Sequence, residues 1–373
     1  MVTLPQHEGI NVGMLNQSIA FKQLTNSYKI YWLYAVFEEV IRGNRQIPFE
    51  TLVCRMVAKN WFSSIQYKLN LGAQDKLYNL VTYIHQRYIP EVKIQEEHLH
   101  EQLVHLANTE SDRDLHKKIR SLEQYVPYRL LSIFFSDELK GKKDYSKQKI
   151  IEELSNKDKK VLYSINSSKR YIVVNNPWFE YIRQNQSIIK GWLMYHLITF
   201  LQKRNPNVPA IPFKITPPAQ RSLNQQTKFW KALLEAHSFK DIYTGASLNG
   251  ANFSTYGNLS LDHFIPWSFV LHDEMWNLVP TFKNINSKKS DNLPSLDAYF
   301  DKFTSLQYDS ITTAIKVGIN SKILEDYLTI NSSYNLKSSN VLLDKERFKK
   351  DLKSTIEPLY QIAENQGFQQ WVF

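Results

Sequence analysis

Helical spacing of apolar side chains recurs through residues 27–90, where they fall at i, i+3 and i+4, as in an amphipathic α-helix. A glycine and an asparagine at 43–44 interrupt the first run, Pro48 can open the second, and Asp75 precedes the third. A polar stretch rich in Glu and His continues over 90–121. The pattern therefore predicts a series of helices in the N-terminal part of the chain.

The middle of the chain changes character. Residues 140–160 are rich in lysine and are interpreted as a solvated loop, although such a run could also follow a DNA backbone. β-branched and aromatic residues at 161–165 and 171–174, with a polar turn between them, predict a β-hairpin. A long helix is expected from about Asn185 to Lys203.

Prolines mark the clearest boundary in the chain. Residues 204–222 hold several prolines, which cannot continue a helix, so we expect an extended connector there. The predicted fold is mainly α with a small α+β insertion. It comprises a helical N-terminal domain (1–203, with the hairpin near 161–174), the connector (204–222), the α+β domain (223–300) and a helical C-terminal segment (301–373).

Within the last two parts, a short helix is expected at 224–237 and a final amphipathic helix from Asp344, after a polar stretch at 331–340. The end of the chain is aromatic. Phe368 and Trp371, with Phe373, are expected to pack against the body of the protein, because an exposed aromatic tail would favour aggregation.

Composition narrows the class of protein. The 373 residues are 43% apolar and 13% aromatic, enough to form cores, and this length favours two or three domains. The net charge of +10 favours a polyanionic partner such as nucleic acid. A single cysteine, Cys54, excludes a disulfide framework and a cysteine-based zinc site within the chain. The longest apolar run, 191–201, is too short to span a bilayer. Without a recognisable signal peptide, we expect a cytoplasmic protein that does not enter a membrane.

The residues whose side chains point most clearly to a catalytic reaction lie at 259–294. Asp262 and His263 are adjacent near the end of a predicted strand, and Asn286 lies on a predicted short helix with Lys289 one turn further on. Carboxylate and amide oxygens are hard ligands suited to Mg²⁺, and a neutral imidazole can take a proton from water. Pro266 permits the bend that two neighbouring strand residues need to serve one site. These groups suffice for phosphodiester hydrolysis.

The combined pattern is more specific than its parts. Asp262-His263 is followed by Asn277 within WNLVP and by Asn286 before KSDNLP. This arrangement resembles the HNH, or ββα-metal, nuclease family. The resemblance implies that His263 is the general base, that Asp262 and Asn286 bind one divalent ion, Mg²⁺ or Mn²⁺, and that Asn277 braces the loop that orients the histidine.

Lys289 occupies a position that is lysine in similar HNH proteins, and contacts to nucleic acid are expected for Lys283, Lys288 and Lys289. The segment 241–248 resembles the first turn of such a domain, where many HNH proteins bind structural zinc through paired cysteines. This chain has no cysteine there. We therefore expect no structural zinc, and we expect packing around Tyr243 and Gly245 to hold the turn.

Two other clusters are interpreted as structural. His98, His100 and His105 do not share one helical face and are interpreted as part of a solvated helix. Asp273-Glu274 is interpreted as a solvated loop rather than a ligand pair. A glycine-rich phosphate loop is absent from the sequence, which gives NTP hydrolysis no support.

We therefore expect a metal-dependent HNH DNA endonuclease that hydrolyses phosphodiester bonds. The flanking helical regions resemble those of larger bacterial HNH proteins of restriction or anti-phage defence. DNA is the expected partner, with a protein that recruits or restrains the nuclease, or a second copy of the chain, as further partners. Two alternatives stay open: a non-catalytic nucleic-acid or partner-binding module on the HNH fold, and an RNase toxin.

Overall fold

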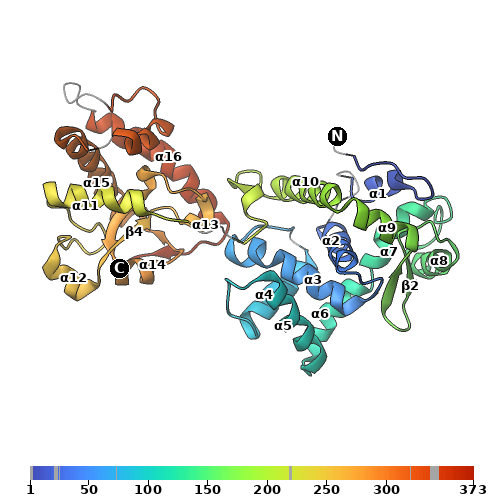
Figure 1. Ribbon diagram of the computed structural model, residues 1–373. Coiled ribbons are helices and arrows are strands. Elements are labelled where there is room, and N and C mark those ends of the chain that lie inside the picture. The colour runs from blue at the N-terminus through green and yellow to red at the C-terminus, as the bar shows by residue number, and fades with distance from the viewer. Residues whose placement is uncertain are drawn as a thin grey trace. The chain divides into compact units, whose positions relative to one another are not determined.

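The structure is a computed structural model that describes residues 3–20, 24, 26–72, 74–217, 221–319, 321–336 and 344–373. The chain divides into two compact units (Figure 1). The N-terminal unit comprises Met1–Pro206 and Ile211–Pro218, and the C-terminal unit comprises Asn207–Ala210 and Ala219–Phe373. Both are mainly helical with small sheets, which confirms the predicted fold class. No helix in the described ranges is both long and apolar enough to cross a membrane.

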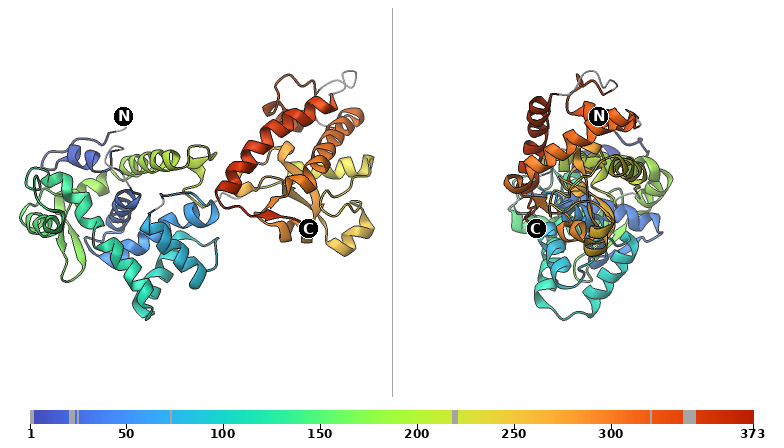
Figure 2. Two further views of the ribbon diagram at one scale, coloured as in Figure 1. Left: turned by 180° about the vertical axis from the view of Figure 1, so that it is seen from behind. Right: turned by 90° about the vertical axis from the view of Figure 1, so that its left-hand side faces the viewer.

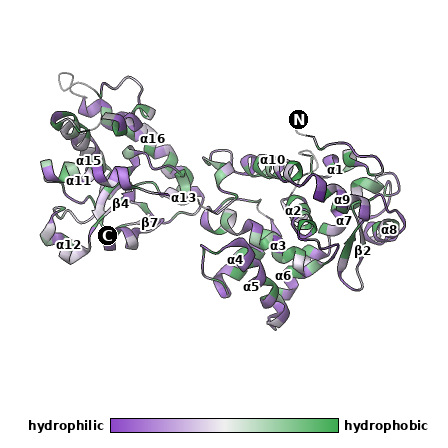
Figure 3. Ribbon diagram, in the orientation of Figure 1, coloured by the Kyte–Doolittle hydropathy of each residue, from purple (hydrophilic) through white to green (hydrophobic). Residues whose placement is uncertain are grey.

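The N-terminal unit is a helical body with one small sheet. Its elements are α1 (Val12–Ser18), α2 (Tyr28–Ile41), β1 (Gln46–Pro48), α3 (Phe49–Trp61), η2 (Phe62–Gln66), α4 (Lys76–Arg87), α5 (Glu96–Thr109), α6 (Arg113–Glu123), α7 (Val126–Leu131), η3 (Ser132–Phe135), α8 (Asp144–Lys157), β2 (Tyr163–Asn166), β3 (Tyr171–Val174), α9 (Asn176–Gln184), α10 (Gln186–Arg204) and η4 (Ile211–Phe213). Polar and apolar colours alternate along these helices (Figure 3), as the sequence periodicity predicts.

The predicted hairpin is present as β2 and β3, and β1 adds a third strand that the sequence analysis did not identify. The order is β1-β3-β2, with Ile47 and Ile165 both paired to Ile172. Pro48 ends β1, and the next residue, Phe49, donates its N–H to the carbonyl of Arg170 at 2.9 Å. A proline at the edge of a sheet is tolerated because its missing N–H faces away from the ladder.

The lysine-rich stretch is not a loop, as interpreted from the sequence, because most of it forms α8. Ile151 and Ser155 on this helix are buried, and Ser155 accepts a hydrogen bond from the N–H of Ile165 at 3.3 Å. Ile151 is the one buried aliphatic residue among the 14 residues of α8, and the rest of the helix surface is mostly polar. That composition masks the helical period in the sequence.

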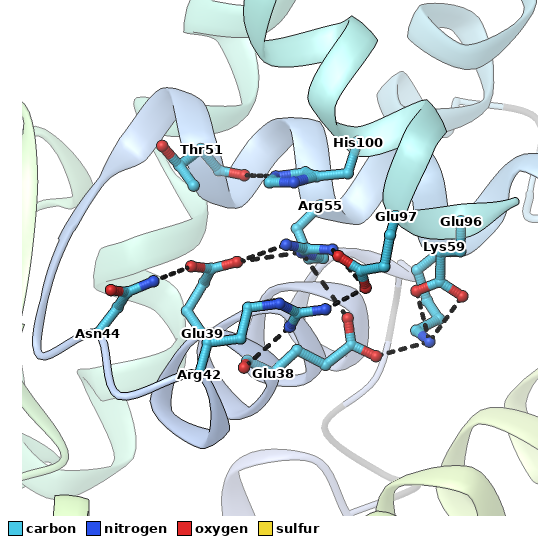
Figure 4. Close-up of polar contacts among 10 residues, drawn as sticks. All are labelled: Glu38, Glu39, Arg42, Asn44, Thr51, Arg55, Lys59, Glu96, Glu97 and His100. Carbon is cyan, nitrogen blue, oxygen red and sulfur yellow. Dashed lines mark hydrogen bonds and ion pairs between the residues drawn. The ribbon is translucent and has the colours of Figure 1, made fainter.

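An ion-pair network joins α2, α3 and α5 (Figure 4). The side chain of Arg55 is 2% exposed, and its guanidinium binds Glu39 at 2.8 Å and Glu97 at 3.0 Å. Beside it, Lys59 binds Glu38 at 2.7 Å. Because Glu39 is itself only 3% exposed, this carboxylate depends on Arg55 for compensation of its charge.

We expect Arg55→Ala to lower the free energy of unfolding of the N-terminal unit by about 3–5 kcal/mol, because the buried carboxylate of Glu39 would lose its cation. The matched control is Arg42→Ala. Arg42 contacts the same network through Glu97, but its side chain is 34% exposed, so about 1 kcal/mol or less is expected. Chemical denaturation, with hydrogen exchange of the α2 and α3 amides, measures both. Equal losses in the two variants would contradict the prediction.

The histidines of α5 differ from one another. His98 and His105 are exposed, as interpreted. His100 is 8% exposed, and its Nε2 lies 3.3 Å from the carbonyl oxygen of Thr51. Burial lowers the pKa of His100, so it acts as a neutral core histidine that joins α5 to α3.

The C-terminal unit contains a strand pair with helices around it (Figures 1 and 2). Its elements are α11 (Asn224–Ala236), α12 (Gly250–Tyr256), β4 (Leu259–His263), α13 (Trp267–Val270), η5 (Met275–Asn277), β5 (Leu278–Phe282), α14 (Lys283–Lys289), β6 (Leu293–Pro294), α15 (Leu296–Val317), η6 (Ser321–Thr329), α16 (Lys345–Asn365) and β7 (Gln370–Trp371). Strands β4 and β5 are antiparallel, and α14 begins where β5 ends. This is a ββα unit.

Helix α15 and the end of the chain support the ββα unit. Phe303 on α15 stacks on Phe264, directly after β4, with ring centroids 4.0 Å apart. Strand β7 pairs in parallel with β6. Phe368 is buried and Trp371 packs edge-on against Tyr243 at 5.2 Å, whereas Phe373 is 52% exposed.

The final helix begins after its cap Asp344, as expected. Of the expected polar stretch, 337–340 lies outside the described residues.

Candidate active site

Asp262 and His263 are the last two residues of β4, and both are buried, with exposed fractions of 3% and 5%. The chain turns directly after them. Asn277, which is fully buried, closes this turn: its Nδ2 donates to the carbonyl of Ile265 at 2.9 Å, and its Oδ1 accepts from the N–H of Ile265 at 2.8 Å. Asn277 therefore braces the backbone that carries the histidine.

The carboxylate of Asp262 is held by two buried side chains. The hydroxyl of Tyr243 donates to Oδ2 at 2.5 Å, and Nζ of Lys289 donates to Oδ1 at 3.0 Å. Lys289 also donates to the carbonyl of His263 at 2.8 Å. Burial, and then the charge of Asp262, raise the pKa of Tyr243, so its phenol stays protonated and remains a donor. The orientation of the Asp262 carboxylate is thus fixed by the protein.

Tyr243 reaches Asp262 from the turn at 241–248. Asp241 closes this turn by accepting hydrogen bonds from the N–H of Thr244 at 2.8 Å and from its hydroxyl at 2.6 Å. Gly245 has a φ of +73°, a backbone conformation that glycine adopts without strain. Hydrogen bonds and a glycine therefore hold the turn that delivers Tyr243.

Asn286 on α14 faces the same strand. Its Nδ2 donates to Oγ of Ser260 at 2.8 Å and to the carbonyl of Leu261 at 2.9 Å. Both hydrogen bonds are made by the amide nitrogen, and they hold the side chain of Asn286 against β4. The Asp262 carboxylate and the Asn286 amide oxygen are both hard oxygen donors, the kind of ligand that Mg²⁺ and Mn²⁺ take together with water. The donor chemistry therefore fits a divalent ion. Within the described ranges, no cluster of three or more His, Cys, Asp or Glu side chains could hold a metal.

His263 has a partner that the sequence interpretation missed. Its Nε2 lies 2.8 Å from Oδ1 of Asp273, and Arg221 binds the same oxygen at 2.6 Å. Asp273 is therefore not a solvated loop residue, as interpreted, but contacts the histidine. A proton on Nε2, assigned here from the carboxylate partner, leaves Nδ1 as the basic nitrogen.

Burial, rather than the carboxylates around it, favours the neutral form of His263. Burial lowers the pKa of the imidazole, and Arg221 lowers it further, while Asp273 opposes both. Burial raises the pKa of Asp273, but hydrogen bonds and charges from His263 and Arg221 outweigh this, so its net pKa lies below the ordinary value. An ionised carboxylate thus faces a neutral imidazole, which is the arrangement of a general base with its orienting group.

The predicted nucleic-acid contacts fall into two groups. Lys283 and Lys288 are exposed on α14. Lys289 is 1% exposed and directs its charge at Asp262. Phosphate contact by these lysines stays a prediction, and the structure gives Lys289 a contact within the site.

Comparisons with known proteins agree with this geometry. A family model described as HNH endonuclease matches residues 241–295. The chain is also similar to the CRISPR-associated endonuclease Cas9 of Listeria innocua serovar 6a, at 40% identity over 58 residues. That match covers 16% of this chain and 4% of the Cas9 chain. No solved structure matches the chain. The matched stretch contains β4, β5 and α14, together with the turn that delivers Tyr243. Residues 241–295 are therefore a domain of the HNH endonuclease family.

Proposed function

We propose that this protein is a metal-dependent DNA endonuclease whose active site is built on Asp262, His263 and Asn286. The observation that supports this most directly is the ββα unit that carries these three residues on β4 and α14, with His263 backed by Asp273. Membership of residues 241–295 in a nuclease family supports the reaction class.

In the proposed reaction, Nδ1 of His263 accepts a proton from a water molecule. The oxygen of this water forms a bond to the phosphorus of the phosphodiester, and the bond between phosphorus and the 3′ oxygen breaks. Asp273 stabilises the resulting imidazolium through Nε2. Lys289 and Tyr243 keep the Asp262 carboxylate in place. A divalent ion held by Asp262 and Asn286 would stabilise charge on the leaving oxygen. One such site cuts one strand, so cleavage of both strands requires a second copy or two sequential events.

The proposed cellular role is bacterial restriction or anti-phage defence, with a partner protein that recruits or restrains the nuclease. Its support is the resemblance of the helical flanks to larger bacterial HNH proteins. Incubation with modified and unmodified phage DNA tests this role, because a restriction enzyme must discriminate between the two.

The enzymatic test uses supercoiled plasmid, linear duplex, single-stranded DNA and RNA, each with Mg²⁺, Mn²⁺ or a chelator. We expect cleavage of DNA with either metal and none with the chelator. Cleavage of RNA alone would instead support an RNase toxin. Silence on every substrate with every metal would support a non-catalytic binding module.

A further prediction concerns Asp273. We expect Asp273→Ala to slow cleavage by about 10–100-fold, because an unoriented histidine presents the wrong nitrogen or the wrong angle to water. Glu274→Ala is the matched control, since the neighbouring Glu274 carboxylate accepts a hydrogen bond from Thr329 at 2.7 Å instead of one from His263. Single-turnover cleavage measures the rate, and the Mg²⁺ titration midpoint should stay unchanged. Similar rates in both variants would rule out an orienting role for Asp273.

A further inference from the structure

The positive charge of the chain is concentrated away from the nuclease domain. Residues 1–218 hold 30 of the 46 Lys and Arg but only 20 of the 36 Asp and Glu, so the entire net charge of +10 lies there. In residues 219–373 the remaining 16 basic and 16 acidic residues cancel. Because residues 219–373 carry no net charge, the HNH domain within them gains little long-range attraction to a polyanion. Any such attraction must therefore come from the N-terminal unit.

Helix α6 concentrates this charge on one face. Arg113, Lys117 and Arg120 recur at helical spacing and are exposed, so they lie on the same side. They line an open hollow of about 620 Å³. The opposite face is apolar and buried through Leu115 and Ile119. The helix therefore presents its three cations on one solvent-facing side.

These cations lack anionic partners within the part of the chain that the structure describes. No ion pair or side-chain hydrogen bond is formed by Arg113, Lys117 or Arg120 among those residues. The nearby carboxylate of Asp112 is instead engaged by Tyr83 at 2.5 Å and Tyr88 at 2.6 Å. Elsewhere in the same unit, Arg55 and Lys59 are matched by glutamates (Figure 4). The α6 face differs from that pattern because its three cations have no such carboxylate partner among the described residues.

A second hollow of about 770 Å³ continues this surface between α7 and α8. Arg129, Lys140 and Lys147 line it, with Asp144 offsetting part of the charge through its 2.6 Å ion pair to Lys147. The two hollows adjoin. Gln124 lines the first and Gln148 lines the second, and the side chain of Gln148 donates to the carbonyl of Gln124 at 2.9 Å.

We propose that these two hollows, lined by α6, α7 and α8, form a binding surface for the phosphodiester backbone of DNA. The choice of DNA among polyanions rests on the proposed nuclease function. Arginine and lysine side chains on a helix neutralise successive phosphates without reading bases, and this contact positions a nucleic acid regardless of its sequence. The N-terminal unit thus supplies affinity and the HNH domain supplies cleavage.

The test replaces the three α6 cations in the full chain, as Arg113→Gln, Lys117→Gln and Arg120→Gln together. The background is His263→Ala, so that DNA stays intact. Fluorescence anisotropy with a labelled duplex at several salt concentrations gives the dissociation constant. We expect binding weaker by about tenfold, and a slope of log K against log salt that is shallower by about 3, since each lost phosphate contact removes about 0.9 from the slope of B-DNA.

The matched control neutralises three exposed lysines outside both hollows, Lys157→Gln, Lys159→Gln and Lys160→Gln. It removes the same total charge, so a purely global effect would weaken binding equally in both variants and overturn the proposal. Unchanged DNA binding by the α6 variant would also overturn it. If that variant instead lost binding to phosphatidylserine vesicles, the surface would be one for membranes.

The outcome is separable from the nuclease proposal. Specific loss of DNA binding in the α6 variant, with no plasmid cleavage by the unsubstituted chain, would sustain the surface and reject the nuclease. Plasmid cleavage by the unsubstituted chain, together with equal DNA binding by the two triple variants, would sustain the nuclease proposal and reject the binding surface. Circular dichroism of each variant confirms that the helices are intact, and glutamine is well tolerated in helices.

Discussion

Replacing His263 by alanine is expected to slow DNA cleavage by about 10²–10⁴-fold, the usual contribution of a general base. The histidine is 5% exposed at the end of β4, its Nε2 is engaged by Asp273, and its other nitrogen is left to accept a proton. The attacking water must lose a proton during the reaction, and the alanine variant has no imidazole to accept that proton. Nicking of supercoiled plasmid under single-turnover conditions measures the loss.

The same variant should bind DNA almost as tightly as the unsubstituted protein, because a buried imidazole contributes little to backbone affinity. His237→Ala is the matched control, since His237 is exposed at the end of α11 and packs on Phe239 with ring centroids 4.9 Å apart. Unaltered cleavage by His263→Ala would overturn its assignment as the base. Weakened binding with a normal cleavage rate at saturating protein would give the histidine a binding role instead.

The site was predictable to the extent that it is local in the chain. Asp262, His263, Asn277 and Asn286 lie within one ββα unit, where a short connection with α13 and η5 joins β4 to β5 and α14 follows β5 directly. A motif with fixed spacing can therefore encode their relative positions. The bracing hydrogen bonds from Asn277 to the turn match the role that the family resemblance implied for it.

The side chains that contact these residues come from parts of the chain outside the two strands and the helix. Tyr243 reaches Asp262 from a separate turn, and Arg221 reaches Asp273 from 52 residues earlier in the chain. Asp273 lies in a loop whose course no periodic pattern encodes. Its charge suggested solvent exposure, yet the histidine and the arginine together compensate for its partial burial. Tertiary proximity decides such contacts, so a sequence pattern could not have supplied them.

The same distinction holds for the fold. Helices with a clear apolar face were predicted, whereas α8 was missed because most of its residues are polar and Ile151 is its one buried aliphatic residue. Strand β1 has only three residues and ends in Pro48. Strand β7 pairs with β6 across a long stretch of chain. Short strands are defined by the strands they pair with, which lie far away in sequence, rather than by an alternation of apolar and polar residues of their own.

The second large effect is expected for Asp262→Asn, which keeps the shape of the side chain but removes its charge. A bound divalent ion contributes several kcal/mol to the stabilisation of the transition state, so cleavage should fall by about 10²–10³-fold. The Mg²⁺ concentration needed for half-maximal cleavage should rise. Asp297→Asn, at an exposed carboxylate in the first turn of α15, is the control and should leave both quantities unchanged.

The substitution also has a structural consequence that must be separated from catalysis. The side chains of Lys289 and Asp262 are 1% and 4% exposed and lie 3.0 Å apart, so Asp262→Asn leaves a buried ammonium without its anion and should destabilise the C-terminal unit by about 3–5 kcal/mol. Adding Lys289→Met removes the unpaired charge. We expect the double variant to recover most of this stability in thermal unfolding while cleavage stays low. If cleavage recovered together with stability, Asp262 would serve only to anchor the lysine, and the proposed metal site would be wrong.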